Sequence, residues 1–67
     1  MMLFLKFESG EGAAINVLEL SHMRFDPKEG TMTFYMNNQD SLRVQCPDLA
    51  RFEAMVSLIA KSQEAAQ

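Results

Sequence analysis

The sequence predicts an α+β domain, in which a small antiparallel β-meander of about four strands is followed by one C-terminal α-helix packed on one face. Large apolar residues alternate with polar ones over residues 21–26 and again over 31–37, which is the two-residue period of a strand. Short turn-like segments separate the alternating stretches, so neighbouring strands must run antiparallel. From Leu49 onward the apolar residues follow helical spacing instead.

The first strand and a less regular stretch come from the N-terminal part of the chain. Residues 2–8 alternate like a strand, and residues 9–12 predict a turn because their two glycines accept the positive φ angles of tight reversals. The extended pattern resumes at Ala13 and is broken over 18–20, which indicates a bulge or bend. Residues 13–26 are therefore either one kinked strand or two short ones.

A β-hairpin is predicted over residues 22–37. Pro27 presets φ at the first turn position, and Gly30 accepts the left-handed conformation that closes the turn. A second turn over residues 37–40 leads to a last strand over 41–46. By its phase in that strand, Cys46 faces the core as a small buried hydrophobic residue.

The change from strand to helix is expected at Pro47 and Asp48. Proline suits a first helical turn, and a carboxylate stabilises the positive end of the helix dipole. One apolar stripe follows and is expected to cover the sheet: Leu49, Phe52, Met55, Val56 and Ile59. The stripe is lost beyond Lys61, so we predict a single domain over residues 1–62 and a frayed tail over 63–67.

The uncovered face of the sheet is the predicted interaction face, because one helix covers only one side. Pairing Met23 with Phe34, and Phe34 with Val44, aligns the polar residues of three strands into rows. The two predicted rows are His22, Tyr35 and Arg43, and Arg24, Thr33 and Gln45. Phe4 and Lys6 join this face if the first strand belongs to the same sheet.

Residue types on this face allow an ordinary and a functional interpretation. Thr, Arg, Gln and Tyr are good solvent-facing strand residues. Tyr and Arg are also enriched at binding hot spots, and a domain this small gains stability by burying a face against a partner. A second route to self-association is an edge strand, whose unpaired backbone groups template another strand. The first strand, rich in Leu and Phe, is the edge best suited to this.

No catalytic, cofactor or metal site is predicted. His22 is the only histidine and has no predicted carboxylate to orient it, and Cys46 is the only cysteine. One His and one Cys cannot complete a structural zinc site, and residues 9–12 lack the Gly-Lys-Ser/Thr end of a phosphate loop. The net charge of −3 argues against a nucleic-acid surface, although a local basic patch is compatible with it. No apolar run approaches the roughly 20 residues that span a bilayer, and we expect a cytoplasmic protein.

The expected function is that of a small non-enzymatic interaction module, an adaptor or accessory protein of a bacterium or phage. We expect it to form a homodimer through the open sheet face or an edge strand. One alternative is nucleic-acid binding through His22, Arg24, Tyr35 and Arg43, with Lys6. The other is a regulatory subunit of an enzyme whose chemistry lies elsewhere.

Overall fold

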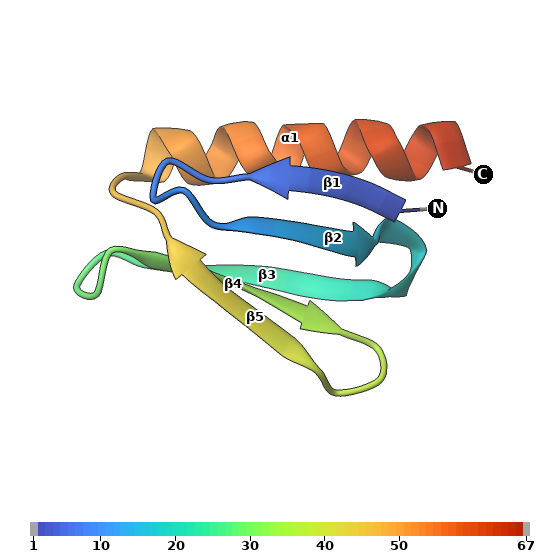
Figure 1. Cartoon of the computed structure of the whole chain (residues 1–67), viewed down its shortest axis with the longest axis horizontal. Coiled ribbons are helices and arrows are strands. Elements are labelled where there is room, and N and C mark those ends of the chain that lie inside the picture. The colour runs from blue at the N-terminus through green and yellow to red at the C-terminus, as the bar shows by residue number, and fades with distance from the viewer. Residues whose placement is uncertain (1, 67) are drawn as a thin grey trace.

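The computed structural model describes residues 2–66, which form two antiparallel sheets followed by one C-terminal helix that contacts the sheet (Figure 1). The predicted α+β class is confirmed. The elements are β1 (Met2–Lys6), β2 (Gly12–Asn16), the 3₁₀ turn η1 (Val17–Glu19), β3 (Leu20–Asp26), β4 (Thr31–Met36), β5 (Ser41–Gln45) and α1 (Leu49–Ala66). The strands form a β1–β2 pair and a β3–β4–β5 sheet rather than one meander.

Residues 13–26 form two strands, which resolves the choice that the sequence left open. Between them η1 turns the chain, and the Asn16 side chain caps it by accepting a hydrogen bond from the Leu18 N–H (3.2 Å). The pairing of β3 with β4 also shifts between Leu20 and His22, so a bulge follows the turn. The break in alternation over residues 18–20 therefore has a structural counterpart.

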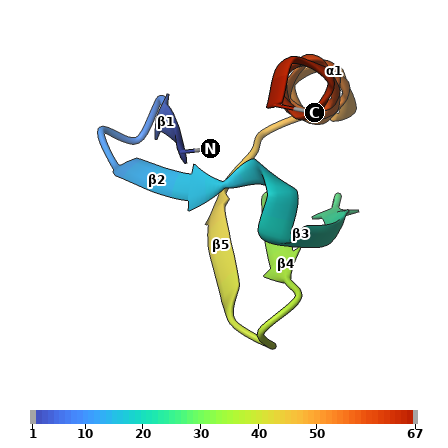
Figure 2. The same ribbon diagram turned by 90° about the vertical axis from the view of Figure 1, so that its right-hand side faces the viewer.

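One face of the three-stranded sheet carries both the β1–β2 hairpin and α1. Figure 2, which looks along the helix, shows the hairpin and α1 beside each other on the same side of β3, β4 and β5. Apolar residues from all three parts meet in a single core. Its buried members are Leu5, Phe7, Ile15, Val17, Met32, Phe34, Val44, Cys46 and Ile59.

The helix covers the core with a stripe that differs from the predicted one. Leu49 and Val56 are 54% and 40% exposed, so the prediction that they face the sheet is wrong. The buried or half-buried positions are Phe52, Met55, Ile59, Ser62, Gln63 and Ala66. This stripe fits the position of α1, whose backbone lies nearest to η1 and to β3, the outer strand of its sheet.

The last turn of α1 is held by a side-chain contact. The predicted fraying begins at residue 63, yet residues 63–66 are helical in the structure. Gln63 Nε2 donates a hydrogen bond to the carbonyl oxygen of Val17 (2.9 Å), a partner 46 residues away. Gln67 lies outside the described residues.

The predicted register is confirmed in the first hairpin and wrong in the second. Met23 pairs with Phe34 and Arg24 with Thr33, as expected. On the other side, Thr33 faces Arg43 rather than Gln45, a shift of two residues along β5. The turn explains the shift, because the Met36 N–H donates to Asp40 O (2.9 Å) and Gln39 adopts a φ of 74°. These features give a tight three-residue loop instead of the four-residue turn that the sequence suggested.

Candidate functional site: the open sheet face

The face of β3–β5 opposite the core is the candidate site, and the structure brings all six predicted residues onto it. We call it the open sheet face; its predicted members are His22, Arg24, Thr33, Tyr35, Arg43 and Gln45. Thr33 and Tyr35 of the central strand are half-buried, and the other four are exposed. Because the register of β5 is shifted, the rows are composed differently from the prediction. They are His22, Tyr35 and Ser41; Arg24, Thr33 and Arg43; and Asp26, Thr31 and Gln45.

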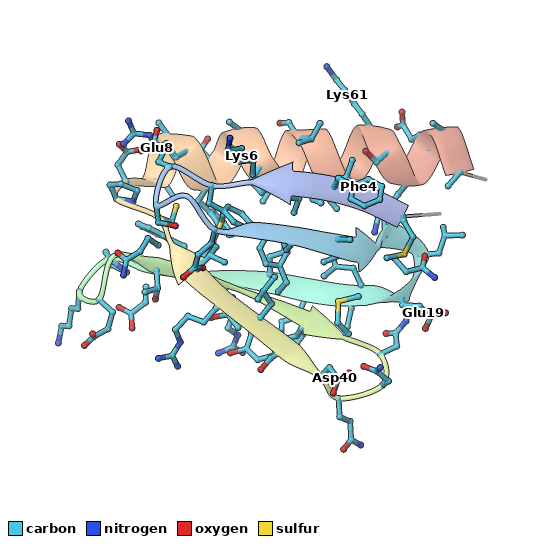
Figure 3. All side chains as sticks on the ribbon, in the orientation of Figure 1. Phe4, Lys6, Glu8, Glu19, Asp40 and Lys61 are labelled. Atoms are coloured by element: carbon cyan, nitrogen blue, oxygen red, sulfur yellow. The ribbon has the colours of Figure 1, made fainter. Side chains whose placement is uncertain are left out.

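Phe4 and Lys6 do not join the open sheet face. Both belong to β1, which pairs with β2 in the other sheet (Figure 3). The condition under which the sequence placed them on this face is not met, because the first strand is not part of the three-stranded sheet. This removes Lys6 from the basic patch that the nucleic-acid alternative requires.

His22 and Tyr35 form a stacked pair on this face. Their ring centroids lie 4.5 Å apart with an interplanar angle of 10°, and the Ser21 hydroxyl lies 3.1 Å from His22 Nδ1. Across residues 2–66, no carboxylate hydrogen-bonds to the imidazole. The pair therefore presents two stacked aromatic rings on this face, and among the described residues it lacks the carboxylate that commonly orients a general base.

Arg24 and Arg43 flank Thr33 on the two neighbouring strands. Neither guanidinium makes an ion pair or hydrogen bond within the described part of the chain. Arg51, by contrast, is bound through Nε to Glu8 (2.9 Å) and through Nη1 to Asp48 (3.1 Å). Within residues 2–66, therefore, two arginines without an ionic partner lie in the same row of the open sheet face, although the chain as a whole is acidic.

A hollow of about 330 Å³ lies over this row. Both guanidinium side chains line it, together with the hydroxyl-bearing side chains of Thr31, Thr33 and Tyr35. Its end near the β3–β4 turn carries Asp26 and Glu29. The Asp26 carboxylate is already engaged, because Oδ1 accepts hydrogen bonds from the backbone N–H groups of Lys28 (3.0 Å) and Glu29 (3.3 Å).

A second hollow, of about 360 Å³, lies where β1, β5 and the first turn of α1 meet. Its lining includes Phe7, Met32, Met55 and the only cysteine, Cys46. Cys46 as a residue is 1% exposed, and its Sγ donates to the carbonyl oxygen of Asp48 (3.4 Å). Burial raises the pKa of this thiol, which keeps it protonated and poorly nucleophilic. The prediction that Cys46 faces the core is confirmed.

The outer edge of β1 is a further exposed feature. The Phe7 N–H donates to Glu11 O (2.8 Å), and the register continues through Leu5 and Leu3. Hydrogen-bonded pairs alternate along an antiparallel ladder, so the N–H and C=O groups of the intervening residues point away from β2. Phe4, at the centre of this edge, is 79% exposed.

Within residues 2–66, no group of three or more His, Cys, Asp or Glu side chains is arranged to hold a metal ion. In the same range, α1 does not combine the length and apolar character that crossing a membrane requires.

Comparison of the chain with protein-family models, with curated proteins and with solved structures finds no match.

Proposed function

We propose that the protein is a non-enzymatic interaction module that self-associates by pairing the free edge of β1 with the same edge of a second copy. The observation that carries this proposal is Phe4, whose side chain is 79% exposed at the centre of an edge with outward-pointing backbone groups. Met2, on the same side of the strand, is 51% exposed. Apolar exposure of this kind on an edge strand is a template for another strand.

A two-fold axis through Phe4 gives a self-complementary pairing. In an antiparallel pair centred there, Phe4 faces the partner's Phe4 and Met2 faces the partner's Lys6. All three residues direct their N–H and C=O groups outward, so each facing pair can exchange both backbone hydrogen bonds. The paired aromatic rings add about 0.5–1.5 kcal/mol beyond the area that they bury. The result is a four-stranded sheet that crosses the dimer.

Electrostatics favour the β1 edge over the open sheet face as the dimer contact. Burying the open sheet face against a second copy removes Arg24 and Arg43 from water, whereas the Asp26 carboxylate of that face already accepts hydrogen bonds from the backbone of its own turn. An unpaired buried charge costs several kcal/mol. The β1 edge carries one charge, Lys6, whose flexible side chain can keep its ammonium group in water.

Sedimentation of the full chain at micromolar concentration tests the proposal. We expect a dimer for the wild type and a folded monomer for Phe4→Glu, because the two-fold axis places the two new carboxylates opposite each other. Leu58→Glu is the matched control. Leu58 is 44% exposed on α1, so the same change in chemistry there leaves the dimer intact.

Two results would count against the β1 edge. If the wild-type chain sediments as a monomer, the protein does not self-associate and the proposal is wrong. If the dimer persists in Phe4→Glu but dissociates in Tyr35→Ala, the dimer interface is the open sheet face and not the β1 edge.

A further inference from the structure

The open sheet face carries a second binding feature, independent of the β1 edge, in the row Arg24, Thr33 and Arg43. Arg24 faces Thr33, and Thr33 faces Arg43, so all three side chains emerge on one side of adjacent strands. Facing residues in antiparallel strands lie about 4.5–5.5 Å apart, which puts the two arginine backbones about 10 Å from each other. Thr33 is short, so both guanidinium groups can lean inward above it.

Both cations in this row are available to a ligand. Within residues 2–66, neither Arg24 nor Arg43 has an ion-pair or hydrogen-bond partner, and both side chains are exposed. They line the 330 Å³ hollow with the hydroxyl-bearing side chains of Thr33 and Tyr35. Guanidinium groups bind carboxylates and phosphates through paired N–H donors, and hydroxyl groups add further donors.

The acidic residues at one end of the hollow restrict the charge of that ligand. Asp26 and Glu29 lie at the turn end of the same hollow and repel an anion of high charge density. Carboxylates spaced along a peptide carry fewer negative charges per unit length than a nucleic acid, which has one at every phosphodiester, so the turn carboxylates and the chain's net charge of −3 repel the peptide less. This combination favours carboxylates over the phosphates of a nucleic acid.

We infer that the row Arg24, Thr33 and Arg43 binds an acidic peptide segment of a partner protein through its side-chain carboxylates. An extended peptide presents alternate side chains on one side, about 6.6–6.8 Å apart. Two such carboxylates fall within reach of two long arginine side chains whose backbones are about 10 Å apart. The stacked pair of His22 and Tyr35 bounds the neighbouring row and offers an apolar surface beside the charged one.

Titration of the full-length ¹⁵N-labelled protein with defined peptides tests this inference. The probe is acetyl-Glu-Ser-Glu-Ser-Glu-amide, and its matched control replaces each Glu with Gln. We expect saturable shifts of the Thr33 and Arg43 amide signals with the Glu peptide at low salt, and no saturable shift with the Gln peptide. Binding should weaken as sodium chloride is added, because exposed charges are screened.

Substitutions locate the site. Arg24→Gln and Arg43→Gln should each lower the affinity for the Glu peptide roughly tenfold, because each removes one charge-assisted contact. Lys61→Gln removes the same charge from α1, outside the hollow, and should leave the affinity within about twofold, because distant exposed charges are screened. All three positions are exposed, and a far-UV circular dichroism spectrum of each variant checks the fold.

Three results would overturn the inference. Equal binding of the Gln and Glu peptides shows that the carboxylates are not recognised. If Lys61→Gln and Arg43→Gln lower the affinity for the Glu peptide equally, the binding depends only on the net charge of the protein. Tighter binding of inorganic phosphate or of a ten-residue oligothymidylate than of the Glu peptide assigns the row to phosphate ligands instead. The peptide comparison uses the wild-type chain, so it remains decisive even if a variant fails to fold.

Discussion

Phe34 and Tyr35 are neighbours in the chain with opposite environments. Phe34 is fully buried, with its ring centroid 6.4 Å from that of Phe7. Tyr35 lies on the other side of β4, half-buried and stacked on His22. The alternation of the sequence predicts this division, because successive side chains of a strand point to opposite faces.

Truncation of Phe34 should therefore unfold the protein. Phe34→Ala removes a buried ring from a tightly packed core, which costs about 3–5 kcal/mol. That is much or all of the stability of a domain this small. Urea denaturation followed by far-UV circular dichroism measures the loss.

Tyr35→Ala is the control on the opposite face. It removes a stacked cross-strand pair, and we expect a loss of about 1 kcal/mol in the free energy of unfolding. If Tyr35→Ala unfolded the chain and Phe34→Ala did not, the assignment of Phe34 to the core and Tyr35 to the open sheet face would be wrong.

At the scale of single elements, the β4–β5 turn decides which residues share a row. The sequence predicts the faces of β5 correctly but not its register, because nothing in residues 37–40 marks Gln39 as the residue with a positive φ. Glycine or asparagine is the usual signal for that conformation, and two asparagines stand just before Gln39. By contrast, Gly30, at a φ of 64°, marks the β3–β4 turn, and the register predicted there is confirmed.

Gln39→Gly should stabilise the protein. A side chain in the left-handed region costs about 1–2 kcal/mol, which glycine avoids at the expense of a more flexible unfolded chain. We expect a net gain of about 0.5–1 kcal/mol in the free energy of unfolding, measured by urea denaturation.

Asn38→Gly is the informative comparison in the same turn. Asn38 Oδ1 accepts a hydrogen bond from the Asp40 N–H (3.0 Å), which glycine cannot replace. This variant should lose stability. A loss on Gln39→Gly as well would contradict the left-handed assignment.

The helix shows a second limit of pattern reasoning at this scale. Helical spacing selects a stripe but does not say what lies opposite each residue. Leu49 and Val56 fit the apolar period and are exposed, whereas Phe52 fits it and stacks on Phe25 with ring centroids 5.6 Å apart. The difference arises from the placement of α1 beside η1 and β3, which depends on the whole fold.

For the molecule as a whole, the class was predictable and the division into two sheets was not. Local alternation and short turns specify hairpins, and these follow from the sequence. Whether two hairpins merge into one sheet depends on the geometry of the segment that joins them. Here Val17–Glu19 turns the chain, so the β1–β2 hairpin shares the core with α1 instead of extending the sheet that carries the open sheet face.

A long-range hydrogen bond ties the end of the helix to that joining segment. Gln63→Ala leaves the carbonyl oxygen of Val17, a fully buried residue, without its side-chain donor. We expect a loss of about 1–3 kcal/mol in the free energy of unfolding, the cost of an unsatisfied buried acceptor.

Glu64→Ala controls for the loss of a polar side chain in the same helical turn, because Glu64 is exposed. It should change stability by no more than about 0.5 kcal/mol. Equal effects of the two substitutions in urea denaturation would mean that the Gln63 contact contributes nothing.

Cys46, the only cysteine, lines the apolar hollow, and its reactivity can report how often the folded protein opens. A disulfide reagent reaches the buried Cys46 only in molecules that have opened, so the rate of mixed-disulfide formation, corrected for the thiolate fraction at each pH, reports the population of open forms. Alkaline conditions should favour opening, since the pKa raised in the folded state lets the unfolded chain release this proton more readily. No engineered cysteine is needed to follow that equilibrium.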